Sequence, residues 1–275
     1  MSVGKYIVRS IIMGKTKVIY KILIAFFIII FVGAVTFIVV TKVKEAKNKA
    51  NMETIVEEVK EDTATDSGST DDTTSIDNNG NMYQSPIDFA QLQQEQNPDI
   101  YAWIKILDTQ IDYPILQNTS DDAYYLNHNI DGSSGYPGCI YSEALNKQDF
   151  SDPVTVLYGH NMKDGSMFAG IHKYSDKAYL EEHNIITIYT PEREYTYKVF
   201  AAYVSDDQHI LKTHDFSTST SFTTYIDGIL DKREMTDIID TSVEVDSNSK
   251  ILTLSTCVAN QATQRFLVQA VLIEE

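Results

Sequence analysis

The sequence predicts a mostly β domain, built as a closed barrel or a sandwich with peripheral helices and preceded by a single transmembrane helix. Two observations carry this prediction. Eight short runs are rich in β-branched and aromatic residues, and several alternate apolar and polar side chains, which is typical of half-buried strands. Near the N-terminus, residues 22–40 form an uncharged apolar run. Eight short strands separated by turn residues favour a closed barrel or a sandwich.

The apolar run ILIAFFIIIFVGAVTFIVV has 19 residues, of which only Thr36 carries a polar side chain. At 1.5 Å of rise per residue it is about 28 Å long, close to the roughly 30 Å hydrocarbon core of a bilayer. A cleaved signal peptide is the alternative, but its apolar region has typically about 7 to 15 residues, so we favour an uncleaved anchor. Five basic residues precede the run and four follow closely, which leans toward a short basic cytoplasmic N-terminus, residues 1–21.

Residues 41–84 are predicted to be an acidic, flexible, extracellular linker. The charged part at 42–59 is compatible with a continuing helix, but residues 61–81 are acidic, rich in Ser and Thr, and almost without large apolar side chains. Such a segment cannot bury enough apolar surface to offset the entropy of ordering it. The folded domain is therefore expected at residues 85–275.

The elements of this domain follow in order. A helix is expected to begin at Pro86, with Ile87, Ala90 and Leu92 near one face and Phe89 off that register. The eight predicted strands are residues 101–106, 110–116, 138–142, 154–159, 185–190, 194–205, 250–256 and 265–273. Helical insertions are predicted at residues 120–126, 166–171, 176–182 and 217–232.

Charge and motif content exclude several function classes. The formal net charge is −17, although residues 1–49 hold nine basic side chains against one acidic one, so the rest of the chain is strongly acidic. Such a surface repels nucleic-acid phosphates. The chain has no Gly-rich phosphate loop, no internal repeat, and no HExxH or CxxC spacing for zinc.

Three residues with the chemistry of acyl transfer lie at predicted strand ends. His160 follows the apolar strand PVTVLYG, Cys257 follows ILTLST, and Arg265 begins the next strand. An imidazole raises the reactive thiolate population or protonates a leaving amine, and a guanidinium offers a fork of donors to an oxyanion. The alternative is structural: a cysteine at a strand end is often a small apolar side chain, and the arginine a partner of a surface acid.

The remaining histidines and the second cysteine have simpler interpretations. His172, His183, His209 and His214 stand beside charged residues in helix or loop contexts and are expected at the surface. His128 is ambiguous, because a loop histidine often bonds a nearby carbonyl. Cys139 is expected to be a bystander, and a disulfide with Cys257 is the less favoured alternative.

These residues carry a resemblance to a known family. YGHNM at 158–162 and TLSTC at 253–257, together with Arg265, resemble the signatures of sortases, the membrane-anchored cysteine transpeptidases of Gram-positive bacterial surfaces. The longer stretch at 158–176 and a helical segment at about 210–240 look most like class B. Residues 97–117 are similar to the N-terminal part of the class B and class C domain. The resemblance covers residues 86–275.

The resemblance implies an eight-stranded sortase-type β-barrel with Cys257 as nucleophile, His160 as general acid and base, and Arg265 as stabiliser of the carbonyl oxygen. It places Ser255 in the substrate groove and, more weakly, Tyr158 and Asn127. It implies no cofactor and no metal, since the acidic calcium cluster of class A is not evident.

The activity implied is cleavage of a C-terminal sorting motif after Thr, storage of the acyl group as a thioester, and transfer to an amine of the peptidoglycan precursor. The expected partners are surface proteins with an NPxTx-like motif, that amine and the membrane. Three alternatives stay open: a pilin-linking transpeptidase, a hydrolytic cysteine peptidase, and a catalytically silent binding module on a stalk. No class C lid motif precedes the barrel, which argues against a dedicated pilus polymerase.

Overall fold

The computed structural model describes residues 3–65, 75–76 and 82–275, which divide into two compact units between Lys47 and Asn48. The first unit is the N-terminal part of helix α1 (Val3–Thr65). Within α1, the stretch Leu23–Lys60 is long and apolar enough to cross a membrane, with a mean hydropathy of 3.2 over its most apolar window. The large apolar side chains from Leu23 to Val40 that the structure describes are exposed, as a lipid-facing helix requires. The expected apolar N-terminal helix is therefore present.

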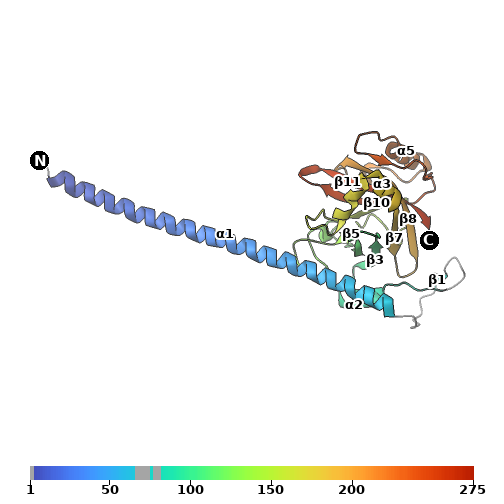
Figure 1. Ribbon diagram of the computed structural model, residues 1–275, viewed down its shortest axis with the longest axis horizontal. Coiled ribbons are helices and arrows are strands. Elements are labelled where there is room, and N and C mark those ends of the chain that lie inside the picture. Colours follow the sequence, from blue (N-terminus) through green and yellow to red (C-terminus); the bar gives the residue numbers. More distant parts are fainter. Residues whose placement is uncertain (1–2, 66–74, 77–81) are drawn as a thin grey trace. The chain divides into compact units, whose positions relative to one another are not determined.

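The second unit is a closed β-barrel (Figure 1). Strand β11 hydrogen-bonds to β10 on one side and to β8 on the other, which closes a ring of eight strands in the order β11, β10, β6, β5, β4, β3, β7, β8. The eight strands are β3 (Ile100–Lys105), β4 (Asp112–Leu116), β5 (Ile140–Tyr141), β6 (Val154–Tyr158), β7 (Ile185–Tyr189), β8 (Glu194–Asp206), β10 (Ile251–Val258) and β11 (Gln261–Glu274). They correspond to the eight predicted runs, and the predicted barrel is confirmed. The short strand β9 (Ile238–Ile239) pairs antiparallel with β8 and lies outside the ring.

Two apolar cores hold the barrel and its helices together. The barrel interior is filled by side chains such as Trp103, Leu254 and Phe266. The second core lies on the outer face of β6, β8, β10 and β11, where helix α5 (Ser219–Leu230) packs with Phe222 and Ile226 (Figure 1). Alternate residues of β10 therefore point inward and outward, which decides where its C-terminal side chains emerge.

The smaller helices, besides α5, are the 3₁₀ helices η1 (Tyr124–Leu126) and η2 (Phe168–Ser175), α3 (Lys177–Glu182) and α4 (Ile210–Thr213). Four of the smaller helices, η1, η2, α3 and α5, fall in the predicted insertions with shifted ends, and α4 lies outside them, within the helical segment expected at about 210–240 from the family resemblance. Helix α2 (Phe89–Glu95) differs in phase from the prediction. Asp88, not Pro86, opens it, because the Asp88 carboxylate accepts from the backbone N–H of Gln91 at 2.8 Å. Phe89 is consequently buried and Ala90 exposed, the reverse of the expected pattern.

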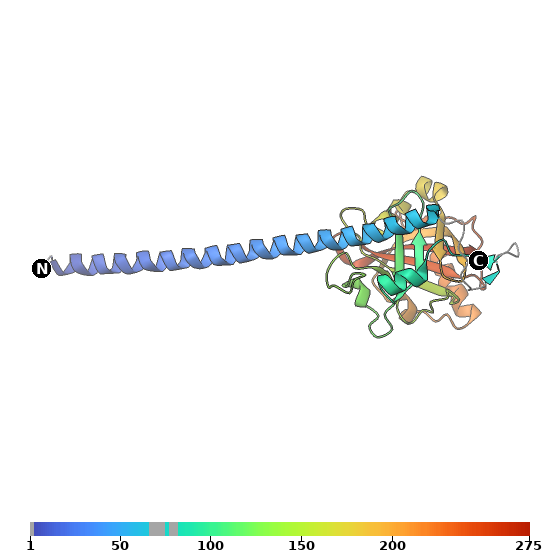
Figure 2. The ribbon, with the colours of Figure 1, turned by 90° about the horizontal axis from the view of Figure 1, so that it is seen from below.

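The predicted linker at residues 41–84 is not uniform. Residues 48–60 of α1 are helical and lie along the barrel (Figure 2), with Met52, Ile55 and Val56 buried in the barrel core. The spacing of these three residues forms one apolar stripe of a helix, a signal that the surrounding charges obscured. The compact unit thus begins at Asn48, upstream of the predicted domain start.

The later part of the predicted linker is described only in short pieces. Strands β1 (Ser75–Ile76) and β2 (Met82–Tyr83) pair antiparallel. The expected flexible segments at 66–74 and 77–81 lie outside the described residues.

Candidate active site

Three adjacent strands bring the predicted reactive residues into one row. In the antiparallel β10–β11 ladder, Cys257 is directly opposite Arg265. In the parallel β6–β10 ladder, Tyr158 is opposite Ser255. His160 follows two residues later in the loop after β6, as Cys257 follows Ser255 in β10. Opposite residues on neighbouring strands are about 5 Å apart. The three residues therefore meet at one end of the barrel, where the side chain of Asn161, next to His160, donates to the Cys257 carbonyl, although they span more than a hundred positions of sequence.

His160 is half-buried and held by a backbone carbonyl. Its Nε2–H donates to the carbonyl of Leu126 at 2.7 Å, and the ring of Tyr136 lies 4.9 Å away, centroid to centroid. Burial lowers the pKa of His160, against the smaller opposing effect of the Leu126 carbonyl. Gly138 makes this arrangement possible: its φ is +68°, and a Cβ there would lie 2.8 Å from the Leu126 oxygen.

Arg265 is half-buried and is fixed at one end by its own strand. Its Nη1 donates to the carbonyls of Ala262 at 3.0 Å and Gln264 at 2.9 Å. Both Nη1 hydrogens are thereby used, which leaves Nη2 and Nε to donate to a substrate. The result is an oriented guanidinium one strand away from the thiol.

Cys257 is an exposed free cysteine whose own carbonyl is held by side chains. The β10–β11 register shifts between Cys257 and Val258. The Cys257 carbonyl accepts from Asn161 Nδ2 at 3.0 Å and lies 3.2 Å from His172 Nε2. His172 also stacks on Phe266, with ring centroids 4.6 Å apart. The backbone of Cys257 is thus tied to Asn161, the residue that follows His160.

The surface expectation for His172 is therefore wrong. This side chain is half-buried beside Cys257, and burial lowers its pKa. Charged residues lie near His172 in the sequence, and for this reason the sequence analysis placed its side chain at the surface. Helix η2 nevertheless turns it toward the end of β10, and only the GIHKY context within the family-like stretch could have pointed to it.

The outer face of the barrel leads to the thiol over two stacked tyrosines. Tyr158 stacks on Tyr141 at 5.4 Å, and Ser255 is buried next to Tyr158 in the β6–β10 ladder. Burial raises the pKa of Tyr141, and the negative charge of Glu143 adds to this effect. Sequence reasoning predicted the strand that contains Tyr141 but missed its contact with Tyr158, because the pairing of β5 with β6 is a non-local contact.

Asn127, the third residue assigned to substrate binding, has a different setting. It is exposed, and its backbone carbonyl accepts from Gly135 N at 2.8 Å. It follows Leu126, whose carbonyl binds His160. The structure therefore brings Tyr158 and Ser255 together on one face and places Asn127 in the loop that holds the imidazole.

The other histidines divide into three settings. His128 Nδ1 lies 2.8 Å from the carbonyl of Tyr124, which confirms the simple interpretation of a loop histidine. His183 and His209 are half-buried, each within 3.3 Å of a carboxylate oxygen on a neighbouring segment, so the surface expectation is wrong for both. His214 is exposed as expected.

The second cysteine is separate from the site. Cys139 is buried and free, with its Sγ 3.6 Å from the carbonyl of His128, so the two cysteines form no disulfide. Burial raises the pKa of this thiol strongly, which keeps it protonated. Across the part of the chain that the structure describes, no group of three or more His, Cys, Asp or Glu side chains could hold a metal ion.

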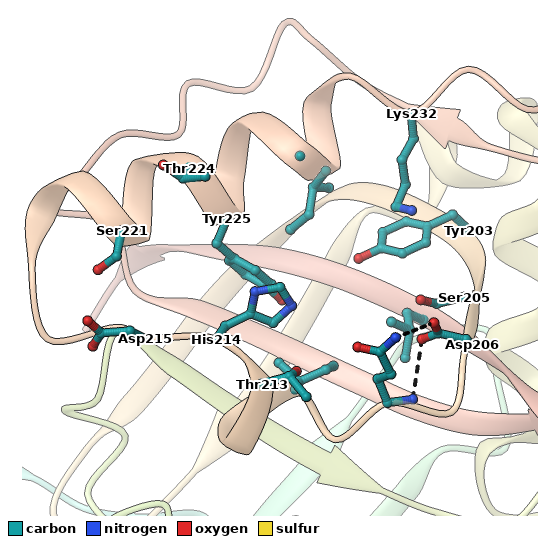
Figure 3. A pocket seen from close by; sticks show the side chains of 15 residues that line it. Tyr203, Ser205, Asp206, Thr213, His214, Asp215, Ser221, Thr224, Tyr225 and Lys232 are labelled. Carbon is teal, nitrogen blue, oxygen red and sulfur yellow. Dashed lines mark hydrogen bonds between the residues drawn. The ribbon is translucent and has the colours of Figure 1, made fainter.

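A pocket of about 440 Å³ opens one strand beyond Arg265 (Figure 3). Its floor includes Ser205, which is opposite Arg265 in the β8–β11 ladder. Helices α4 and α5 form its walls, with Asp215 at one end and Lys232 over the ring of Tyr203 at the other, 4.3 Å from the centroid. The outer face thus carries a hollow with a mixed polar and apolar lining one strand beyond Arg265.

The sequence of the domain matches a profile of the Sortase family, described as the Sortase domain, over residues 104–273. The chain belongs to the sortase family. It is 39% identical over 165 residues to Sortase B of Listeria monocytogenes, covering 60% of this chain and 65% of that protein. It is 29% identical over 180 residues to Sortase B of Staphylococcus aureus, covering 65% of this chain and 72% of that one.

A solved structure of sortase B from B. anthracis superposes with a TM-score of 0.66 at 28% identity, covering 83% of this chain and 99% of that one. The predicted class B character of this sortase is confirmed by these relatives. The chain spans somewhat less than two thirds of the length of the Listeria relative.

Proposed function

We propose that this sortase is a cysteine transpeptidase that attaches proteins to the cell wall. The observation that supports it most is that Cys257 is opposite Arg265 in the β10–β11 ladder and that His160 follows the end of β6, the strand paired with β10 on its other side. A binding module requires none of these three residues, so the non-enzyme alternative leaves the row unexplained.

In the acylation step, the Cys257 thiolate attacks the carbonyl carbon of the threonine in the sorting motif. The carbonyl π electrons move to oxygen, and the free Nη2 and Nε donors of Arg265 stabilise the oxyanion. Collapse of this intermediate breaks the C–N bond. The proton for the leaving amine comes from the His160 imidazolium, and the acyl group remains as a thioester on Cys257.

In the transfer step, a neutral amine attacks the thioester carbonyl. His160 accepts the proton of the attacking nitrogen, Arg265 again stabilises the oxyanion, and the Cys257 thiolate leaves. One amide bond has been broken and one formed, so the sequence needs no cofactor and no energy source beyond the first amide.

The substrate proposed is a secreted protein with an NPxTx-like C-terminal sorting motif, and the acceptor is an amine of the peptidoglycan precursor. Tyr158 and Ser255 are opposite each other in the β6–β10 ladder, two residues before Cys257 in β10, and are proposed to contact an extended peptide at the thiol. Asn127, in the loop beside His160, is proposed to contact the same peptide. The support for this substrate class is the resemblance of the motifs around His160 and Cys257.

Two alternative activities share the acylation step. In a hydrolytic peptidase, water takes the acyl group; in a pilin-linking transpeptidase, the acceptor is a lysine of another pilin. The amine that reacts with the thioester separates these activities from cell-wall attachment.

The deciding experiment incubates the full-length sortase in detergent with a panel of quenched fluorescent peptides, with and without triglycine. Cleavage that depends on Cys257 and yields the triglycine adduct is expected. Cys139→Ala serves as the matched control, because it removes the other thiol and leaves the row intact. Cleavage that survives Cys257→Ala would falsify the mechanism, and cleavage without adduct formation favours the peptidase.

We further propose that α1 anchors the sortase in the cell membrane by a single pass, with a cytoplasmic N-terminus and an extracellular catalytic domain. The apolar stretch within Leu23–Lys60 supports the anchor, and the extracellular substrates of the proposed reaction support the orientation. Protease treatment of intact cells is expected to release the domain. Protection of the domain would contradict the orientation.

A further inference from the structure

Two loops enclose the His160 imidazole. The His160 loop, residues 159–167, is closed by a hydrogen bond from Phe168 N to the His160 carbonyl at 3.0 Å and by an isolated bridge between Asn161 and Met167. At its tip, Asp164 Oδ1 accepts from the backbone N–H of Ser166 at 3.1 Å and from its hydroxyl at 2.7 Å. The conformation of this loop therefore depends on the Asp164 carboxylate.

The Tyr136 loop, residues 127–138, forms the other wall. It is closed by a bridge between His128 and Ser134 and by a hydrogen bond from Gly135 N to the Asn127 carbonyl at 2.8 Å. The Tyr136 ring lies 4.9 Å from the His160 ring. Its position limits how far the imidazole can turn and how much water reaches it.

Both loops are held by the same turn of α1. Lys49 Nζ lies 2.6 Å from Asp164 Oδ2, the oxygen that Ser166 does not use. The Asn48 side chain donates to the Tyr136 carbonyl at 3.2 Å, and its Oδ1 accepts from the Ser133 hydroxyl at 3.4 Å. Two consecutive residues of one helix thus contact both walls around the imidazole.

The helix can hold these contacts because the stretch that follows is docked. Met52, Ile55 and Val56 are each less than 9% exposed and belong to the barrel core. Lys60, further along, lies 3.3 Å from Asp112 on β4, which is part of neither loop. The helix therefore has a fixed position on the barrel apart from its contacts with the loops.

We infer that Asn48 and Lys49 are positioning residues of this sortase: from the docked end of α1, they hold the two loops that orient His160 for proton transfer. The stretch between the apolar part of α1 and the barrel is accordingly part of the catalytic apparatus and not only a spacer. The part of this inference that concerns proton transfer rests on the proposed transpeptidase activity, because that activity assigns His160 its role as general acid and base.

The expected effect is moderate, since the contacts are partly exposed. Lys49 and Asp164 keep 37% and 40% of their side-chain surface accessible. The Lys49 hydrogen bond is the largest cause that lowers the pKa of Asp164 to about 2, so the pair is charged at neutral pH. Exposed pairs change an equilibrium by about two- to five-fold. Lys49→Met is therefore expected to lower kcat by about that factor.

The test uses full-length sortase in detergent and two readouts. The first is kcat and KM for a cleavable sorting peptide in Asn48→Ala, Lys49→Met and the double variant. Lower kcat with little change in KM is expected, because the peptide-lining residues are untouched. The second is the titration of the His160 ring by NMR, which requires no turnover. Loosening the loops admits water, so the lowered pKa of His160 should rise toward its ordinary value near 6.5.

Lys60→Met is the matched control, because it removes an ion pair of the same helix without touching either loop. It is expected to leave kcat and the His160 titration at wild-type values. Lys49→Arg keeps a charged donor facing Asp164 and leaves the Asp164 carboxylate intact, so it should retain part of the activity that Lys49→Met loses. Thermal unfolding of each variant checks that the fold is retained.

Two results overturn the inference. One is an unchanged kcat and an unchanged His160 titration in the double variant. The other is an equal loss of kcat in Lys60→Met and Lys49→Met, which would mean that the effect comes from docking of the helix on the barrel and not from its contacts with the loops. If wild-type sortase forms no thioester, the proposed function fails, yet the titration still decides whether the helix positions His160.

Discussion

Arg265→Lys separates the charge of the guanidinium from its geometry. Arginine has five N–H donors, and two of them are used at Nη1 for the carbonyls of Ala262 and Gln264, at 3.0 and 2.9 Å. Three donors in a fixed plane remain for the oxyanion. A lysine has three donors in all, so satisfying both carbonyls leaves one, on a flexible stem.

Loss of a positioned oxyanion donor lowers kcat by about 10²- to 10³-fold, equivalent to roughly 2.7 to 4 kcal/mol. We expect a loss in this range for Arg265→Lys, measured as steady-state cleavage of a quenched sorting peptide. Because the barrel ladder is unchanged, the midpoint of thermal unfolding should move little. Arg193→Lys is the matched control, since Arg193 pairs with Glu275 away from the row. The loss expected for an oxyanion donor is much larger than about three-fold. A kcat for Arg265→Lys within about three-fold of wild type would therefore refute the role of the planar guanidinium donors.

Three further predictions follow from local geometry. Gly138→Ala should destabilise the fold by about 2 kcal/mol or more and lower kcat, because φ is +68° and the new Cβ meets the Leu126 oxygen at 2.8 Å. Denaturant unfolding and peptide cleavage measure these two effects, and a denaturation midpoint equal to that of wild type would contradict the clash. Iodoacetamide should label one thiol of the native protein, since Cys257 is exposed and Cys139 is buried with a raised pKa; native Cys257→Ala that takes up label by mass spectrometry contradicts this. The carboxyl pKa of Asp164 is about 2 in the folded state and about 3.9 when unfolded, so its contribution to stability is present above pH 4 and disappears as the pH falls toward 2. The stability difference between wild type and Asp164→Asn should shrink over that interval in thermal unfolding, and a constant difference contradicts the assignment.

Local sequence patterns predict secondary structure reliably where a residue type is favoured in a single kind of element. Alternating β-branched and aromatic residues predicted all eight strands of the ring, because a pleated, half-buried strand selects such side chains. The phase of α2 was wrong for a local reason as well. Pro86 and Asp88 are both residues that often begin a helix. The helix begins after Asp88 because this start allows the Phe89 side chain to reach the core.

Non-local contacts produced the larger differences. His172 and Cys257 are far apart in sequence, and only the fold of η2 against the end of β10 brings the imidazole to the carbonyl of Cys257. The docking of residues 48–60 is of the same kind. Met52, Ile55 and Val56 form a stripe that is readable in the sequence, but the surface that covers it belongs to the barrel.

The sequence alone determined the strands, the apolar helix, the acidic surface and the three reactive residues with their family, because each depends on composition, periodicity or a local motif. The tertiary structure decided that Cys257 is opposite Arg265 and at the same end of the barrel as His160, that Asn161 and His172 hold its carbonyl, and that Asn48 and Lys49 reach both loops around the imidazole. These are relations between segments that are distant in the chain. They depend on strand order, register and helix docking, which no local pattern specifies.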